Sequence, residues 1–136
     1  MKRIKTLLIL SLVPIFFSCT STKEIPTDKT LEELKLTAYE YSAKGNYKAS
    51  ERYYSEIIAR FGTDVTTLVS AKYEIAHIYI KQKKYKEALP LLNEVISYYD
   101  ANQGYLPGQF NTLAQIDLKK VYDHENKQNK NKKADN

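Results

Sequence analysis

An internal repeat limits the folds open to this chain, because the sequence matches itself when it is shifted by 38 residues. One small and two aromatic residues keep their spacing in both copies, which are Ala38, Tyr41 and Tyr47, then Ala76, Tyr79 and Tyr85. A third step of the same length places Ala114 at the small position and Asp117 where a tyrosine stood before. A period of roughly 20 to 50 residues indicates that one supersecondary unit is used repeatedly.

Apolar residues recur with the helical period of about 3.6 between Thr30 and Tyr122. Thr30 and Glu33 form a capping box, and glycine with a capping residue separates the next segments at 45–46 and 62–64. The pattern predicts five helices, carrying Leu31 to Tyr41, Tyr47 to Phe61, Leu68 to Ile80, Tyr85 to Tyr99, and Phe110 to Val121. No segment alternates with a period of two, so we expect an all-α domain over 30–122, with two helical hairpins and a lone last helix.

The amino terminus has the features of an export signal. Lys2 to Lys5 are largely basic, and an apolar stretch of twelve residues runs from Thr6 to Phe17. A membrane-spanning helix needs roughly 20 apolar residues, so this stretch is too short to be one. The sequence Phe16-Phe17-Ser18-Cys19 resembles a bacterial lipobox, which implies a signal peptide over 1–18 and a lipid on Cys19. The alternative is an ordinary cleavable signal followed by an incidental cysteine.

Two polar segments flank the predicted domain. Residues 19–29 contain Pro26 and no apolar period, which predicts a lipid anchor at Cys19 followed by a flexible tether. Residues 123–136 contain no large apolar side chain, which predicts a disordered tail.

Charge and motifs give no sign of nucleic-acid binding or catalysis. The formal charge is +5, but without the basic residues of the signal only 18 basic residues face 16 acidic ones, which removes most of the support for a nucleic-acid partner. No Gly-rich phosphate loop, HExxH motif or Cys/His cluster occurs, and His77 and His124 lie far apart in the sequence. We therefore expect no catalytic residue, no metal, no cofactor and no small-molecule substrate. An envelope enzyme acting on peptidoglycan would need an acid pair or a nucleophile that we do not identify.

The repeat resembles the tetratricopeptide repeat. The residues that carry the resemblance are the Gly45-Asn46-Tyr47 turn, the small Ala38 and Ala76, and Tyr85 with Ala88. The lengthened link RFGTDVTTLVSAKYEIA is similar to that of BamD-like lipoproteins. The resemblance implies an α-α superhelix of two and a half repeats and a non-catalytic outer-membrane scaffold facing the periplasm. It also implies a BamA-type barrel subunit as partner. The alternative is a binding module of another envelope system, such as Tol-Pal, cell division or a peptidoglycan-associated system.

The resemblance also implies a site for the partner. In tetratricopeptide stacks the first helix of each pair lines a concave groove that holds an extended peptide or a helix. Counting from the small positions, the expected groove residues are Lys35, Tyr39, Tyr73, His77, Lys81, Gln115 and Lys119. The alternative is that these are merely exposed residues on helices.

Overall fold

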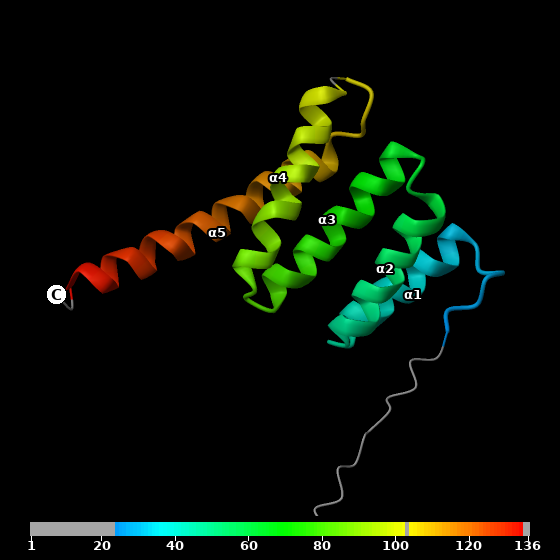
Figure 1. Cartoon of the computed structure of the whole chain (residues 1–136), viewed down its shortest axis with the longest axis horizontal. Coiled ribbons are helices and arrows are strands. Elements are labelled where there is room, and N and C mark those ends of the chain that lie inside the picture. Colours follow the sequence, from blue (N-terminus) through cyan, green and yellow to red (C-terminus); the bar gives the residue numbers. More distant parts are fainter. Residues whose placement is uncertain (1–23, 103, 135–136) are drawn as a thin grey trace, which may run out of the picture.

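The computed structural model describes residues 24–102 and 104–134, which form five α-helices and no strand. The helices are α1 (Leu31–Ala43), α2 (Tyr47–Phe61), α3 (Val65–Lys81), α4 (Tyr85–Ala101) and α5 (Gln109–Ala134). The hairpins α1–α2 and α3–α4 lie side by side, and α5 runs behind α4 and extends beyond it (Figure 1). The prediction of an all-α domain of five helices is confirmed. The signal peptide and Cys19 lie outside the described residues.

The predicted caps start three of the helices. The Thr30 and Glu33 side chains exchange hydrogen bonds with each other's backbone N–H groups in a capping box. The Asn46 side chain accepts a hydrogen bond from the backbone of Ala49, and that of Asp64 accepts one from Thr67. These side chains satisfy N–H groups that have no partner within the first helical turn.

The two hairpin turns have the same geometry. The backbone N–H of Asn46 donates to the Tyr41 carbonyl at 2.8 Å, and that of Lys84 donates to the Tyr79 carbonyl at 2.8 Å. The residue before each donor is left-handed, with a φ of 75° at Gly45 and 60° at Lys83. The 38-residue repeat in the sequence therefore corresponds to a repeat in backbone structure.

Helix α3 is the centre of the core, because its opposite faces contribute to two clusters of buried residues. The first cluster joins α1, α2 and α3 through Leu34, Ala38, Tyr54, Ile57, Ala71, Ile75 and Ile78. The second joins α3, α4 and α5 through Val69, Tyr73, Ala76, Ile80, Ala88, Leu92, Val95, Ala114 and Val121. Each hairpin therefore buries its apolar face against a neighbour, as expected for units that cannot fold alone.

The segment before α1 is held against α2, which corrects part of the predicted flexible tether. The Arg60 guanidinium donates hydrogen bonds to the backbone carbonyls of Ile25, Pro26 and Thr27, at 3.4, 2.9 and 3.1 Å. Its Nε also pairs with Glu56 at 2.6 Å, and Ile25 packs on the first core cluster. The prediction of a flexible segment is therefore wrong for 25–27, because a side chain 33 to 35 residues away satisfies these carbonyls.

Helix α5 continues to Ala134, so the prediction of a disordered tail is wrong for residues 123–134. This segment has no proline or glycine, and extending a helix that is already anchored avoids the cost of a new nucleus. The His124 ring also packs against Tyr85, with ring centroids 4.2 Å apart. The remaining residues, 135–136, lie outside the described part of the chain. None of the helices in that part has the length and apolar character needed to cross a membrane.

Candidate functional site

Helices α1, α3 and α5 lie along one face of the domain. A pocket of about 480 Å³ opens on this face, near the N-terminal ends of α3 and α5. Lys35, Leu36 and Tyr39 of α1 line this pocket, together with residues of α2, of α3 and of the first turn of α5. The side chains of Leu36 and Tyr39 are 60% and 66% exposed. Large apolar side chains at the rim of an apolar hollow are typical of a protein-binding surface. The structure thus places Lys35 and Tyr39, two of the expected groove residues, at the same pocket.

The pocket contains two polar groups with unused hydrogen-bonding capacity. Glu74 and Tyr54 line it, and neither side chain forms a hydrogen bond or ion pair within residues 24–102 and 104–134. Burial raises the pKa of Glu74, against the opposing charges of His77 and Lys81. Burial also raises the pKa of Tyr54, and the charge of Glu74 adds to this increase. A half-buried carboxylate without a partner is energetically unfavourable, so a ligand that supplies a positive charge or a donor gains from binding here.

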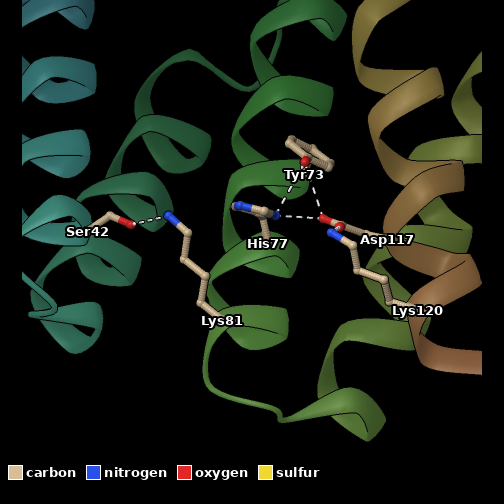
Figure 2. A network of polar contacts seen from close by, with 6 residues as sticks. All are labelled: Ser42, Tyr73, His77, Lys81, Asp117 and Lys120. Carbon is tan, nitrogen blue, oxygen red and sulfur yellow. Dashed lines mark hydrogen bonds and ion pairs between the residues drawn. The ribbon is translucent and has the colours of Figure 1, made fainter. Parts of the chain in front are cut away.

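A second polar group lies further along the same face, between α3 and α5 (Figure 2). Asp117 is buried at 1% exposure and accepts three hydrogen bonds. The His77 Nδ1 lies 2.6 Å from its Oδ2, the Tyr73 hydroxyl donates to the same oxygen at 3.2 Å, and the Lys120 Nζ donates to Oδ1 at 2.7 Å. On the other side of α3, Lys81 donates to the Ser42 hydroxyl of α1 at 3.3 Å.

The charges in this network keep Asp117 ionised despite its burial. Burial acts to raise the pKa of Asp117, but the hydrogen bonds and charges of His77 and Lys120 outweigh it, so the pKa is lowered. Burial raises the pKa of Tyr73, and the Asp117 charge raises it further, so its hydroxyl stays a donor. The network therefore joins α3 to α5, because both oxygens of the Asp117 carboxylate accept hydrogen bonds.

The structure shows that one expected groove residue is buried, and that two others contact neither the pocket nor the Asp117 network. Tyr73 is only 4% exposed, because it lies between Phe110 and the His77 ring, each with its centroid 5.7 Å away. It belongs to the core and does not line a groove. Gln115 is exposed and donates only to Asn111 on its own helix. Lys119 is exposed and forms no hydrogen bond or ion pair with any residue that the structure describes.

The His77–Asp117 pair has the geometry by which a carboxylate orients an imidazole for proton transfer. The partners of the His77 ring are Asp117 and Tyr73, and the hydroxyl of Tyr73 is a buried donor. Because Asp117 comes from α5 and the ring from α3, the pair ties these two helices together. The part of the chain that the structure describes contains no group of three or more side chains suited to holding a metal ion.

Sequence reasoning missed Asp117, Glu74 and Phe110. The signal for Asp117 was present in the repeat, because a carboxylate stands where the two earlier copies have Tyr41 and Tyr79. A charged residue on an apolar face predicts a partner on a facing helix, here His77. Glu74 and Phe110 had no comparable signal, because only the packing of α5 on α3 brings them to the pocket.

Comparison with known proteins finds a relative that matches most of this chain. The chain is 33% identical over 130 residues to an uncharacterized protein of Treponema pallidum (strain Nichols). The aligned region covers 91% of this chain and 52% of the relative, so the chain spans about half the length of the protein it matches. No protein-family model and no solved structure matches the sequence.

Proposed function

We propose that this chain is a non-catalytic scaffold lipoprotein whose tetratricopeptide-like hairpins bind a protein partner at the periplasmic face of the outer membrane. The pocket at the start of the α1, α3 and α5 face carries this proposal, because it exposes Leu36 and Tyr39 beside an apolar hollow. The matching turns at Gly45 and Lys83 support the repeat architecture. The lipid on Cys19 supplies the membrane attachment, since two or more acyl chains bind a bilayer stably where one does not.

The partner proposed is a BamA-type barrel subunit of the machinery that inserts β-barrel proteins, on the basis of the resemblance to BamD-like lipoproteins. The alternative partner belongs to another envelope system, such as Tol-Pal. The groove residues that remain in this proposal are Lys35, Tyr39, His77 and Lys81, because Tyr73 is buried and Gln115 and Lys119 have no link to the pocket or the network.

The test is crosslinking and affinity capture from solubilised membranes, with a tag after α5. We expect recovery of a large barrel protein with the wild-type chain, and its loss when Leu36→Ser and Tyr39→Ala are combined. The matched control is Tyr105→Ala, which removes a 90% exposed tyrosine that does not line the pocket. Capture of Tol-Pal components instead would assign the chain to the alternative system. Equal capture by the double variant would contradict the proposed surface.

Mass spectrometry of the mature amino terminus tests the membrane attachment separately. We expect Cys19 at the first position with its acyl chains. An unmodified Cys19, or cleavage elsewhere, would contradict the lipoprotein part of the proposal.

A further inference from the structure

The pocket between α1, α3 and the start of α5 has the chemistry of a cation site. Its only carboxylate is Glu74, which is half-buried and has no hydrogen bond or ion pair within the described ranges. Buried carboxylates are normally paired, because leaving one unpaired in an apolar setting costs free energy. Glu74 is therefore a charge that a ligand can compensate.

The walls of the pocket suit a cation with an apolar stem. Tyr39, Tyr54 and Phe110 place three aromatic side chains around the same hollow as Glu74. Aromatic faces attract cations, and more strongly where water is excluded. Leu36 and Ile57 line the pocket as well and offer apolar surface for a chain of methylene groups.

Lys35 also lines the pocket, so its positive charge could act on Glu74. Hydrogen bonds from Thr67 lower the pKa of Asp64 first, and the charge of Lys35 adds to that lowering. The charges that act on Glu74 are those of His77, Lys81 and Asp117. Lys35 thus acts on Asp64, and Glu74 forms no ion pair with it.

We propose that this pocket binds the guanidinium group of an arginine side chain presented by the protein partner, with Glu74 as its counter-charge and the aromatic rings around it. Arginine fits better than lysine, because a planar guanidinium stacks on aromatic rings and can donate two parallel hydrogen bonds to one carboxylate. This inference rests on the proposed function in one respect, since it takes the ligand to be part of a protein. It deepens that function by naming the residue that the surface recognises.

The test is a ligand-observed NMR titration of the full chain, solubilised in detergent, with N-acetyl-arginine amide. N-acetyl-citrulline amide is the matched probe, because it has nearly the same shape and no charge. We expect the arginine probe to bind at least about fivefold more tightly than the citrulline probe, a difference of about 1 kcal/mol. In Glu74→Gln we expect this preference to disappear.

Glu87→Gln is the control, because it removes the same charge from an exposed position on α4 outside the pocket. It should keep the preference for arginine, and circular dichroism should show that both variants are folded. Equal binding of the two probes, absence of arginine binding, or unchanged arginine binding by Glu74→Gln would each overturn the proposal.

The titration and the membrane capture test separate claims, so a negative result in one does not decide the other. If the barrel protein is captured but the arginine probe does not bind, the scaffold function stands and the arginine site is wrong. If the probe binds through Glu74 but no envelope protein is captured, the site stands and the assigned partner is wrong.

Discussion

The Ser50 hydroxyl donates a hydrogen bond to the backbone carbonyl of Ala38 at 2.7 Å, and both residues are fully buried. This bond joins α2 to α1 at a buried contact between two small residues. The repeat places Ala88 and Ala76 at the same two positions of the second hairpin, and both are fully buried as well. One hairpin therefore uses a polar contact where the other uses an apolar contact.

Replacing Ser50 by alanine should destabilise the chain only slightly. The change removes one hydrogen bond, worth about 1 kcal/mol, but reproduces the arrangement of the second hairpin and leaves no donor unpaired. Chemical denaturation checks this value. Ser50→Val is the comparison, because extra methyl groups in this packed contact should cost about 1–3 kcal/mol. A loss of several kcal/mol in Ser50→Ala would show that the hydroxyl has a larger role than we infer.

Replacing Lys83 by glycine should stabilise the second hairpin turn. Lys83 has a φ of 60°, whereas its repeat equivalent Gly45 reaches a φ of 75° without a side chain. A left-handed conformation costs a residue with a Cβ about 1 kcal/mol, and glycine avoids this cost. Glycine also loses more conformational entropy on folding, which offsets part of the gain. We expect a net gain of about 0.5 kcal/mol in thermal unfolding. Gly45→Ala should lose about 1 kcal/mol, although a Cβ there meets nothing within 4 Å.

Asp117→Asn should destabilise the chain and alter its response to acid. The variant loses charged hydrogen bonds to His77 and Lys120, which should cost about 1–3 kcal/mol near neutral pH. The pKa of Asp117 is lowered in the fold, so its contribution is complete above the unfolded value of about 4 and is lost as the pH falls through the folded value. Denaturation at several pH values should show the two proteins converging below about pH 4. A constant difference down to pH 2 would contradict this assignment.

Glu74→Gln should have the opposite effect. Burial raises the pKa of Glu74, so the folded state becomes less stable as the pH rises from about 4.3 through the folded pKa, and the penalty remains above it. Removing the charge should therefore stabilise the chain at pH 7, with no gain below pH 4. A variant that is more stable but no longer prefers arginine would be typical of a functional carboxylate kept at a cost in stability.

Arg60→Ala should release the segment before α1. Its guanidinium holds the carbonyls of Ile25, Pro26 and Thr27, so its loss should expose the nearby Lys29 to trypsin. We expect cleavage at Lys29 to be at least about tenfold faster, in line with a loss of about 1.4 kcal/mol of local stability. Lys48→Ala removes a trypsin site from an exposed position of the same helix and serves as the control. Equal rates in all three proteins would show that the contact does not restrain the segment.

Most of the fold could be predicted from the sequence, because its signals are local. The capping box at Thr30, the caps at Asn46 and Asp64 and the apolar stripes each depend on residues within one or two turns. The repeat added the order of the hairpins. The prediction failed where a distant residue decides the structure, as at 25–27, where Arg60 supplies the donors, and at 123–134, where an anchored helix continues.

The candidate site was less predictable for the same reason. Counting from the small positions selected Lys35 and Tyr39, which line the pocket, and His77 and Lys81, which make polar contacts from α3. It could not show that Phe110 and Asp117 of α5 would cover Tyr73, because those contacts span about 40 residues of sequence. Glu74 has no repeat signal, and only its position in the pocket distinguishes it from an ordinary surface glutamate.

The hydrogen bonds from Arg60 to residues 25–27 limit how far the domain can move from the membrane if Cys19 is embedded in a bilayer. Only residues 20–24 then lie between the acylated cysteine and the first restrained carbonyl. So short a linker keeps the C-terminal end of α2, which carries Arg60, close to the lipid headgroups. A partner would therefore meet the domain close to the bilayer and would not have to capture it from solution.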